Sequence, residues 1–78
     1  MEKTFYIIVM KIDGIPYYLH NNGKFYNGFI NSNIKAYKSI KFAKKKYHEI
    51  CSKRPHLLVN IIAVKEGQEI RNGVVIDV

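Results

Sequence analysis

The residues with the chemistry for catalysis or metal binding are three histidines, His20, His48 and His56, and one cysteine, Cys51. His48 and Cys51 are three residues apart, a spacing that places both on one side of a helix, where they could share a metal ion. Two ligands do not complete a metal site, and no carboxylate is evident as an orienter of any histidine. No nucleophile–base pair or pair of carboxylates can be assembled from the other residues. We therefore predict that the protein is not an enzyme and binds no metal or cofactor.

The basic residues gather in one stretch of the sequence, residues 31–56. This stretch holds eight Lys and Arg residues and one acid, Glu49, whereas the rest of the chain has five basic and five acidic residues. The whole net charge of +7 therefore belongs to it. A lysine-rich face often serves only solubility, but the near absence of acids adds self-repulsion that solubility does not need. We expect a polyanionic partner, either nucleic acid or an acidic protein surface.

The same stretch has the pattern of an amphipathic helix. Ser39 is a good N-cap, Pro55 ends the helix, and Lys53 and Arg54 lie in the last turn, where the helix dipole favours cations. The apolar residues fall within one stripe about 100° wide, which should face a core. The stripe consists of Ile40, Ala43, Tyr47, Ile50 and Cys51. Cys51 is therefore more simply a small core residue than a metal ligand.

Phe42 projects away from the apolar stripe into a field of lysines. It stands three residues after the cap, where a glutamate would be favoured. Two interpretations stay open: Phe42 folds over the helix start or packs on a neighbouring loop, or it anchors a partner. In the second case the contact surface is the far side of the helix, which comprises Lys38, Lys41, Phe42, Lys45, Lys46, Lys53 and Arg54.

The first part of the chain reads as a meander of three antiparallel strands. Thr4 to Ile12 is apolar on both faces, which predicts a central strand; its β-branched and aromatic residues argue against the alternative of a short buried helix. Asp13-Gly14 and Asn22-Gly23 are turn signals. The two further strands are predicted at Ile15 to His20 and at Phe25 to Ile30, with a bulge at Gly28.

The remaining segments complete the order β-β-β-α-β-β. Residues 31–38 form a polar connector that could begin with a loose helical turn. Leu57 to Val64 is a nearly continuous apolar run and predicts a strand, which Glu66-Gly67 ends in a turn. The last segment, Glu69 to Val78, carries the hairpin signal Asn72-Gly73 and a short closing strand.

These elements predict one α+β domain over residues 1–78, a single antiparallel sheet with the helix packed on one face. An open barrel with the helix plugging one end fits the same order. The sheet edges are exposed in so short a chain, so two copies could pair edge to edge as a homodimer. No run approaches the roughly 20 apolar residues of a membrane span, so we expect no membrane partner and a cytoplasmic location.

Signatures of sequence-specific nucleic-acid binding are not found. Only Arg54 and Arg71 could make the bidentate fork that reads guanine, so a nucleic-acid contact would be with the backbone and weakly selective. The aromatic residues of the first hairpin could form a stacking platform for single strands, although core packing is the commoner role of such residues. They are Tyr17, Tyr18, Phe25 and Tyr26.

Two segments carry a resemblance to known proteins. They are the aromatic hairpin YYLHNNGKFYNGF, residues 17–29, and the capped basic segment AYKSIKFAKKKYHEI, residues 36–50. Together they resemble small phage and prophage proteins of the anti-defence class, which includes anti-CRISPR inhibitors. The resemblance implies a non-catalytic inhibitor that occupies a site on a host nuclease or its guide complex. Many such inhibitors are acidic mimics of nucleic acid, a pattern from which this basic chain departs.

The expected partner is therefore a host protein or ribonucleoprotein complex, reached through the basic helix in the cytoplasm of the host cell. The alternative is a small nucleic-acid-binding or regulatory protein that contacts phosphates non-specifically with the same face.

Overall fold

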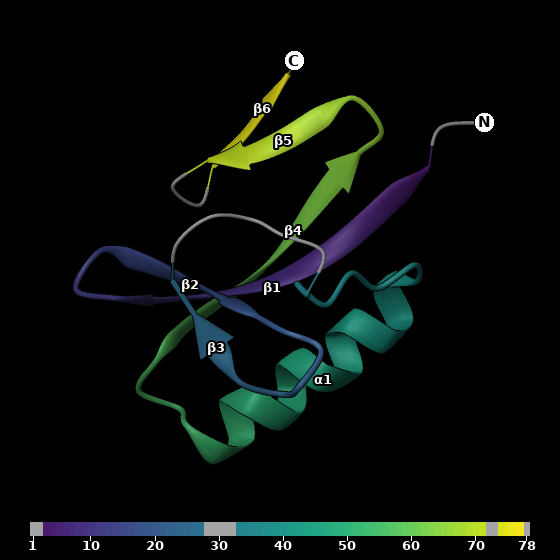
Figure 1. Ribbon diagram of the computed structural model, residues 1–78. Coiled ribbons are helices and arrows are strands. Elements are labelled where there is room, and N and C mark those ends of the chain that lie inside the picture. Colours follow the sequence, from purple (N-terminus) through teal and green to yellow (C-terminus); the bar gives the residue numbers. More distant parts are fainter. Residues whose placement is uncertain (1–2, 28–32, 72–73, 78) are drawn as a thin grey trace.

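The computed structural model describes residues 3–27, 33–71 and 74–77 of the chain. It is an α+β fold in which one helix packs on an open antiparallel sheet (Figure 1), as predicted. The sheet has the strand order β3-β2-β1-β4. Its strands are β1 (Thr4–Ile12), β2 (Ile15–Leu19), β3 (Phe25–Tyr26) and β4 (Leu58–Lys65). Because β3 and β4 are its two edges, the barrel arrangement is not the one observed.

Strand β1 is the centre of the sheet and is buried on both faces. Ile7 and Val9 belong to one buried cluster, whereas Ile8 and Met10 belong to another on the opposite face. This alternation follows from the period of two in a strand, and it explains why the sequence of β1 is apolar at successive positions. Val9 lies between Tyr18 of β2 and Asn60 of β4, which confirms the predicted central position.

Two turns connect the first three strands, and each uses glycine differently. Asp13 and Gly14 have φ angles of 51° and 79°, and Ile12 pairs directly with Ile15, so they form a two-residue turn of the type that matches strand twist. In the second turn Gly23 has a φ of 85°, and its N–H donates to the carbonyl of His20 at 3.0 Å. The Asn22 side chain accepts from the Lys24 N–H at 3.0 Å, which fixes the bend.

Three predicted strands differ from the observed ones at their ends. β4 was expected at Leu57 to Val64 and is observed one residue later, at Leu58–Lys65. Strand β2 ends at Leu19, and His20 forms an isolated bridge with Ile34. The return strand was expected to run to Ile30; β3 is described only as Phe25–Tyr26, and residues 28–30, with the predicted Gly28 bulge, lie outside the described residues.

Helix α1 (Ile40–Lys53) begins and ends where the sequence predicts. The Ser39 hydroxyl accepts from the Lys41 N–H at 3.3 Å, and Arg54 is the C-cap. Ala43 is fully buried, and the rest of the predicted stripe packs on the β1 face that carries Ile8 and Met10. The stripe residues packed there are Tyr47, Ile50 and Cys51, whereas Ile40 at the helix start is 39% exposed.

The second face of the sheet is covered by a hairpin that was expected to extend the sheet. Within the described residues, strands β5 (Gln68–Arg71) and β6 (Val74–Asp77) pair with each other and form a small second sheet. This part of the structure has one more strand after the helix than predicted. Ile70 is buried against Ile7 and Val9, and Val75 packs beside it. The apolar face opposite the helix needs a cover, and this hairpin supplies much of it. Figure 1 shows the hairpin at the end of the molecule away from α1.

The connector before the helix crosses from one face of the sheet to the other. Ile34 is buried with the cluster under the C-terminal hairpin, whereas Tyr37 packs with the cluster under α1. Tyr6 and Tyr37 exchange two backbone hydrogen bonds of 2.8 Å, so Tyr37 continues the line of β2 along β1. From Ile34 to Tyr37 the connector forms bridges and no helical turn, while Asn31 and Ser32, where a turn was expected to start, lie outside the described residues.

Candidate anion-binding surface and cleft

The exposed surface of α1 carries one group of lysines without acidic neighbours. Lys41, Lys44 and Lys45, hereafter the outer row, are all exposed and are related by helical spacings of one, three and four residues. Side chains three and four apart are neighbours on a helix surface, so the three charges lie together. Among the residues that the structure describes, no carboxylate pairs with any of them. The outer row therefore presents unneutralised positive charge to the solvent.

Phe42 stands beside the outer row and is 62% exposed. Its neighbours at three and four residues further along are Lys45 and Lys46. The large exposed fraction shows that no loop in the described part of the chain covers the ring, which argues against packing on a neighbouring loop. An exposed aromatic ring among lysines can contribute apolar contact area to a partner that the lysines attract.

A second line of charge on α1 is partly neutralised. Glu49 Oε1 lies 3.5 Å from Lys46 Nζ and 3.6 Å from Lys53 Nζ. All three side chains are substantially exposed, so each ion pair contributes little to stability. Their main effect is to hold one carboxylate between two lysines on the side of the helix that faces the β2–β3 hairpin.

The predicted contact residues therefore fall into separate places. Lys41, Phe42 and Lys45 lie on or beside the outer row, whereas Lys46, Lys53 and Arg54 line a cleft described below. Lys38 is exposed on a bend before the N-cap and is not part of the helix. Whether these residues contact a partner stays a prediction.

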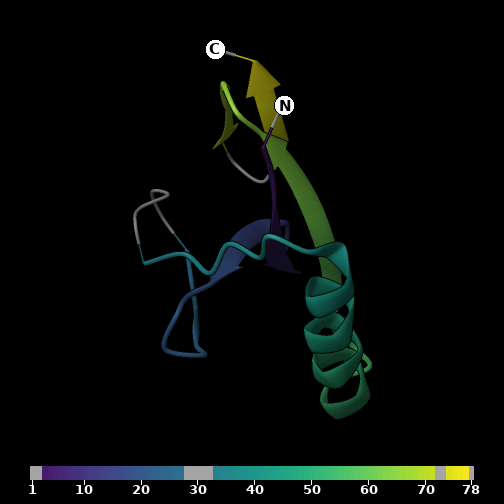
Figure 2. The same ribbon diagram turned by 90° about the vertical axis from the view of Figure 1, so that its right-hand side faces the viewer.

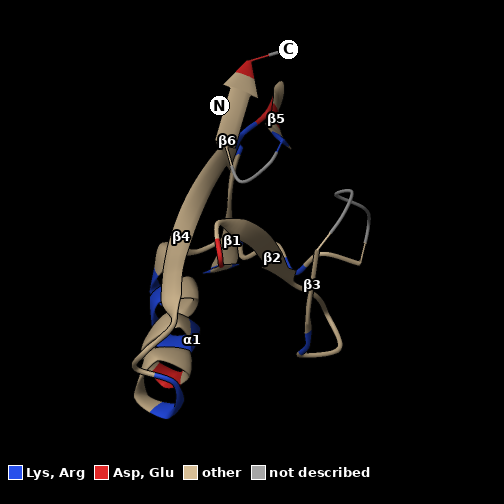
Figure 3. Ribbon diagram, turned by 90° about the vertical axis from the view of Figure 1, so that its left-hand side faces the viewer, with Lys and Arg blue, Asp and Glu red and all other residues tan. Residues whose placement is uncertain are grey.

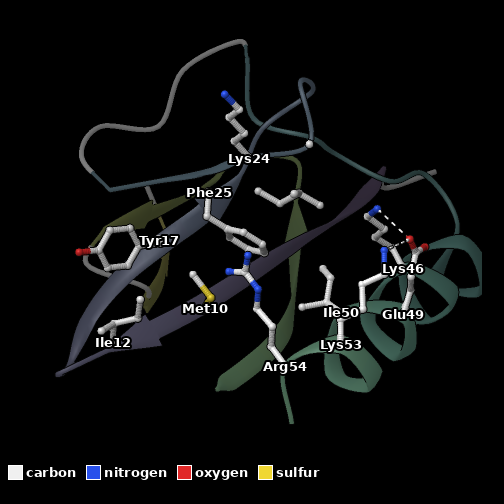
Figure 4. Close-up of a pocket in the computed structure, with 12 residues that line it drawn as sticks. Met10, Ile12, Tyr17, Lys24, Phe25, Lys46, Glu49, Ile50, Lys53 and Arg54 are labelled. Atoms are coloured by element: carbon white, nitrogen blue, oxygen red, sulfur yellow. Dashed lines mark ion pairs between the residues drawn. The ribbon is translucent and has the colours of Figure 1, made fainter. Parts of the chain in front are cut away.

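The cleft lies between α1 and the β2–β3 hairpin. Figure 2 shows α1 beside β4 at one side of the molecule and the segment with β2 and β3 at the other. The cleft encloses about 490 Å³, and Figure 4 shows side chains from both walls pointing into it. It is lined by Met10, Ile12, Tyr17, Leu19, Gly23, Lys24, Phe25, Lys46, Glu49, Ile50, Lys53 and Arg54. Figure 3 shows that basic residues occur on both walls, along α1 and near β3.

The hairpin aromatics do not form one flat platform. Tyr18 is 2% exposed and packs on the face away from the helix, whereas Tyr17 and Phe25 pack on the helix side. Tyr26 is 42% exposed, accepts a hydrogen bond from the Asn22 amide at 3.0 Å and contacts the His20 ring. Core packing thus describes three of the four residues, and successive bases could not stack along them.

The tyrosines near the helix have perturbed acidity. Burial, and after it the negative charge of Glu49, raises the pKa of Tyr37 above its usual value. Contact with Cys51, first through a hydrogen bond and then through charge, raises the pKa of Tyr47. Both phenols therefore stay neutral over a wider pH range than an ordinary tyrosine.

Candidate metal ligands are dispersed. Within residues 3–27, 33–71 and 74–77, no three His, Cys, Asp or Glu side chains are placed to hold a metal ion. Cys51 lies on the side of α1 that packs on the sheet and is partly buried there, as predicted for a core residue. No helix in these described ranges is long and apolar enough to cross a membrane.

Sequence reasoning missed two residues of this surface. Lys44 belongs to the outer row, and its spacing from Lys41 was a sufficient signal for including it. Lys24 lines the cleft from the hairpin turn, well before the helix begins at Ile40, and no local pattern connects it to Lys46 or Arg54.

Comparison with known proteins gives no relative from which a role could be transferred: no family model, curated protein or solved structure matches this chain.

Proposed function

We propose that the protein is a non-catalytic binding protein that docks the outer row of α1 on an anionic partner. The observation that carries the proposal is the acid-free cluster of Lys41, Lys44 and Lys45 beside the exposed ring of Phe42. Positive charges without internal partners attract polyanions over distance and speed association, and an adjacent apolar anchor adds affinity after contact.

The partner proposed first is a host complex that targets nucleic acid, inhibited in the manner of the anti-defence proteins that residues 17–29 and 36–50 resemble. The second candidate is phosphate binding to nucleic acid without sequence selectivity. Its support is the composition of the row, since lysines act as point charges on a phosphate backbone and arginine forks are not part of it.

The test replaces Lys41→Glu together with Lys45→Glu and measures capture of partners from a host lysate. We expect at least about tenfold weaker binding, which corresponds to about 1.4 kcal/mol. The matched control is Lys3→Glu with Lys11→Glu, which changes the net charge equally at exposed sites away from α1. Equal effects of the two double variants would mean that net charge alone acts. Unchanged binding in the outer-row variant would overturn the docking surface.

Three further comparisons separate the two candidates. Phe42→Ala should weaken a protein contact and leave phosphate binding nearly unchanged, because the ring adds apolar area and no charge. Nuclease treatment of the lysate should leave a protein partner bound and release one that nucleic acid bridges. Binding of a random duplex that falls steeply with salt would favour the second candidate, and no binding to duplex or single strand at low salt would exclude it.

A further inference from the structure

The cleft between α1 and the β2–β3 hairpin combines an apolar floor with a basic rim. The deepest floor residues are Met10 and Leu19, which are 4% and 2% exposed. Ile12 at the open end is 39% exposed although it is a large apolar side chain. The remaining apolar lining comes from both walls and comprises Tyr17, Phe25 and Ile50. A floor of this kind gains free energy when an apolar group displaces water from it.

The rim carries four basic residues, Lys24 from the hairpin and Lys46, Lys53 and Arg54 from the helix region, against the single acid Glu49. Glu49 is held between Lys46 and Lys53 at 3.5 and 3.6 Å, so the rim already holds one carboxylate. Within the described residues Lys24 and Arg54 have no ion pair. Lys24 and Arg54, which line opposite walls, are thus available to further carboxylates. Figure 4 shows the Arg54 side chain reaching toward Phe25 and the Lys24 amine turned away from the floor.

The lining favours a peptide over a nucleotide. Most of the floor is aliphatic, and its two aromatic rings, Tyr17 and Phe25, are partly buried in the core cluster. Stacking of bases needs well exposed ring faces, whereas both of these rings are only partly exposed. A methionine and aliphatic side chains instead accept apolar side chains of varied shape. The volume of about 490 Å³ lies within the usual range of small-ligand sites and suits a few side chains, not a folded domain.

From this arrangement we propose that the cleft binds a short acidic peptide segment of the partner protein. A large apolar side chain of the segment lies on the floor beside Met10 and Ile12, and flanking carboxylates pair with Lys24 and Arg54. The inference rests on the proposed function, because it identifies the part of the partner that the helix contacts on its cleft side. It also assigns Lys24, outside the basic stretch, to the contact.

The experiment selects short random peptides displayed on phage against the intact protein and measures the enriched peptide by fluorescence anisotropy. We expect enriched sequences to combine Asp or Glu with Leu, Ile, Phe or Met. Lys53→Glu with Arg54→Glu should weaken the peptide at least about tenfold, or about 1.4 kcal/mol. Because these residues end the helix, Lys24→Glu on the exposed turn provides a second variant, and it should weaken the same peptide severalfold. The peptide with Asn and Gln in place of its acids should lose most of its affinity.

The outer-row variant Lys41→Glu with Lys45→Glu is the control, and it should keep the peptide more tightly than either cleft variant. Failure to enrich any peptide, enrichment of peptides without acids, or binding unchanged by both cleft variants would overturn the proposal. Displacement of the peptide by oligothymidylate at equal charge would overturn it in favour of a nucleotide site. These results would not bear on the proposed docking of the outer row. That proposal alone would be overturned if the peptide bound in the cleft and the outer-row variant still captured the partner unimpaired.

Discussion

Glu49 is the single acid of α1, and its carboxylate affects both the lysines on the cleft side of the helix and Tyr37. It pairs with Lys46 and Lys53 on the cleft side, and its charge adds to burial in raising the pKa of Tyr37. Lys35 Nζ lies 5.3 Å from the centre of the Tyr37 ring. Burial is the larger cause of the raised Tyr37 pKa, and the Glu49 charge is the smaller one.

This shift predicts a loss of stability at high pH. With the pKa of Tyr37 raised in the folded chain, the neutral phenol stabilises the fold at all pH values below about 10, where an unfolded tyrosine ionises. The contribution is lost as pH rises through the folded pKa. Ring-carbon NMR titration resolves Tyr37 from the other five tyrosines. Glu49→Gln should lower the pKa of Tyr37, and Tyr26→Phe should leave it in place. Ionisation of Tyr37 at or below pH 10 would contradict the prediction.

For single residues, the sequence predicted the direction of a side chain around the helix better than the residues that surround it in the fold. Helical periodicity placed Phe42 on the solvent side and Cys51 on the core side, because both depend only on the angle between successive residues. It could not separate Lys45, which belongs to the outer row, from Lys46, which lines the cleft. That division depends on where the β2–β3 hairpin lies, which no spacing within residues 40–53 records.

At the scale of elements, α1 is fixed at its start by a single side chain. The Ser39 hydroxyl satisfies the Lys41 N–H, and no acidic residue supports the first turn. Ser39→Ala should therefore cost about 1 kcal/mol of unfolding free energy, measured by urea denaturation. Ser52→Ala is the matched control on the exposed surface of the same helix, and it should be neutral or slightly stabilising, since alanine is the better helix former. Equal losses in both variants would show that the cap has no special role.

The elements themselves were largely predictable. β1 and α1 have the predicted bounds, because a run apolar on both faces and a capped stripe are strong local signals. The closing strand predicted after Asn72-Gly73 is observed as β6, whereas β5, which precedes these two residues in the chain, was not predicted. Asn72 and Gly73 themselves lie outside the described residues. Turn residues indicate where a hairpin bends but carry no information on which face of a sheet it covers.

For the whole molecule, the two-sided burial of β1 makes the C-terminal hairpin part of the fold. Ile70 is 6% exposed on the face opposite the helix, whereas Val74 in the same hairpin is 59% exposed. Ile70→Ala should lower the unfolding free energy by about 2 to 5 kcal/mol, and Val74→Ala by less than about 1 kcal/mol. Urea denaturation measures both. Similar losses would indicate that the hairpin does not seal that face.

The exposed edges of the sheet bear on the predicted homodimer. β4 pairs with β1 along one side and is an edge strand of the four-stranded sheet, and Leu58 on it is 69% exposed. Pairing of two copies along this edge stays a prediction.

The pairing of β1 with β4 has a consequence for folding during translation. β1 comprises residues 4–12, but the strand that covers one of its edges, residues 58–65, is translated after about fifty further residues. The helix and the C-terminal hairpin, which cover its two faces, also follow β1 in the chain. During elongation β1 therefore stays partly uncovered, and the four-stranded sheet can form only after residues 58–65 have been translated.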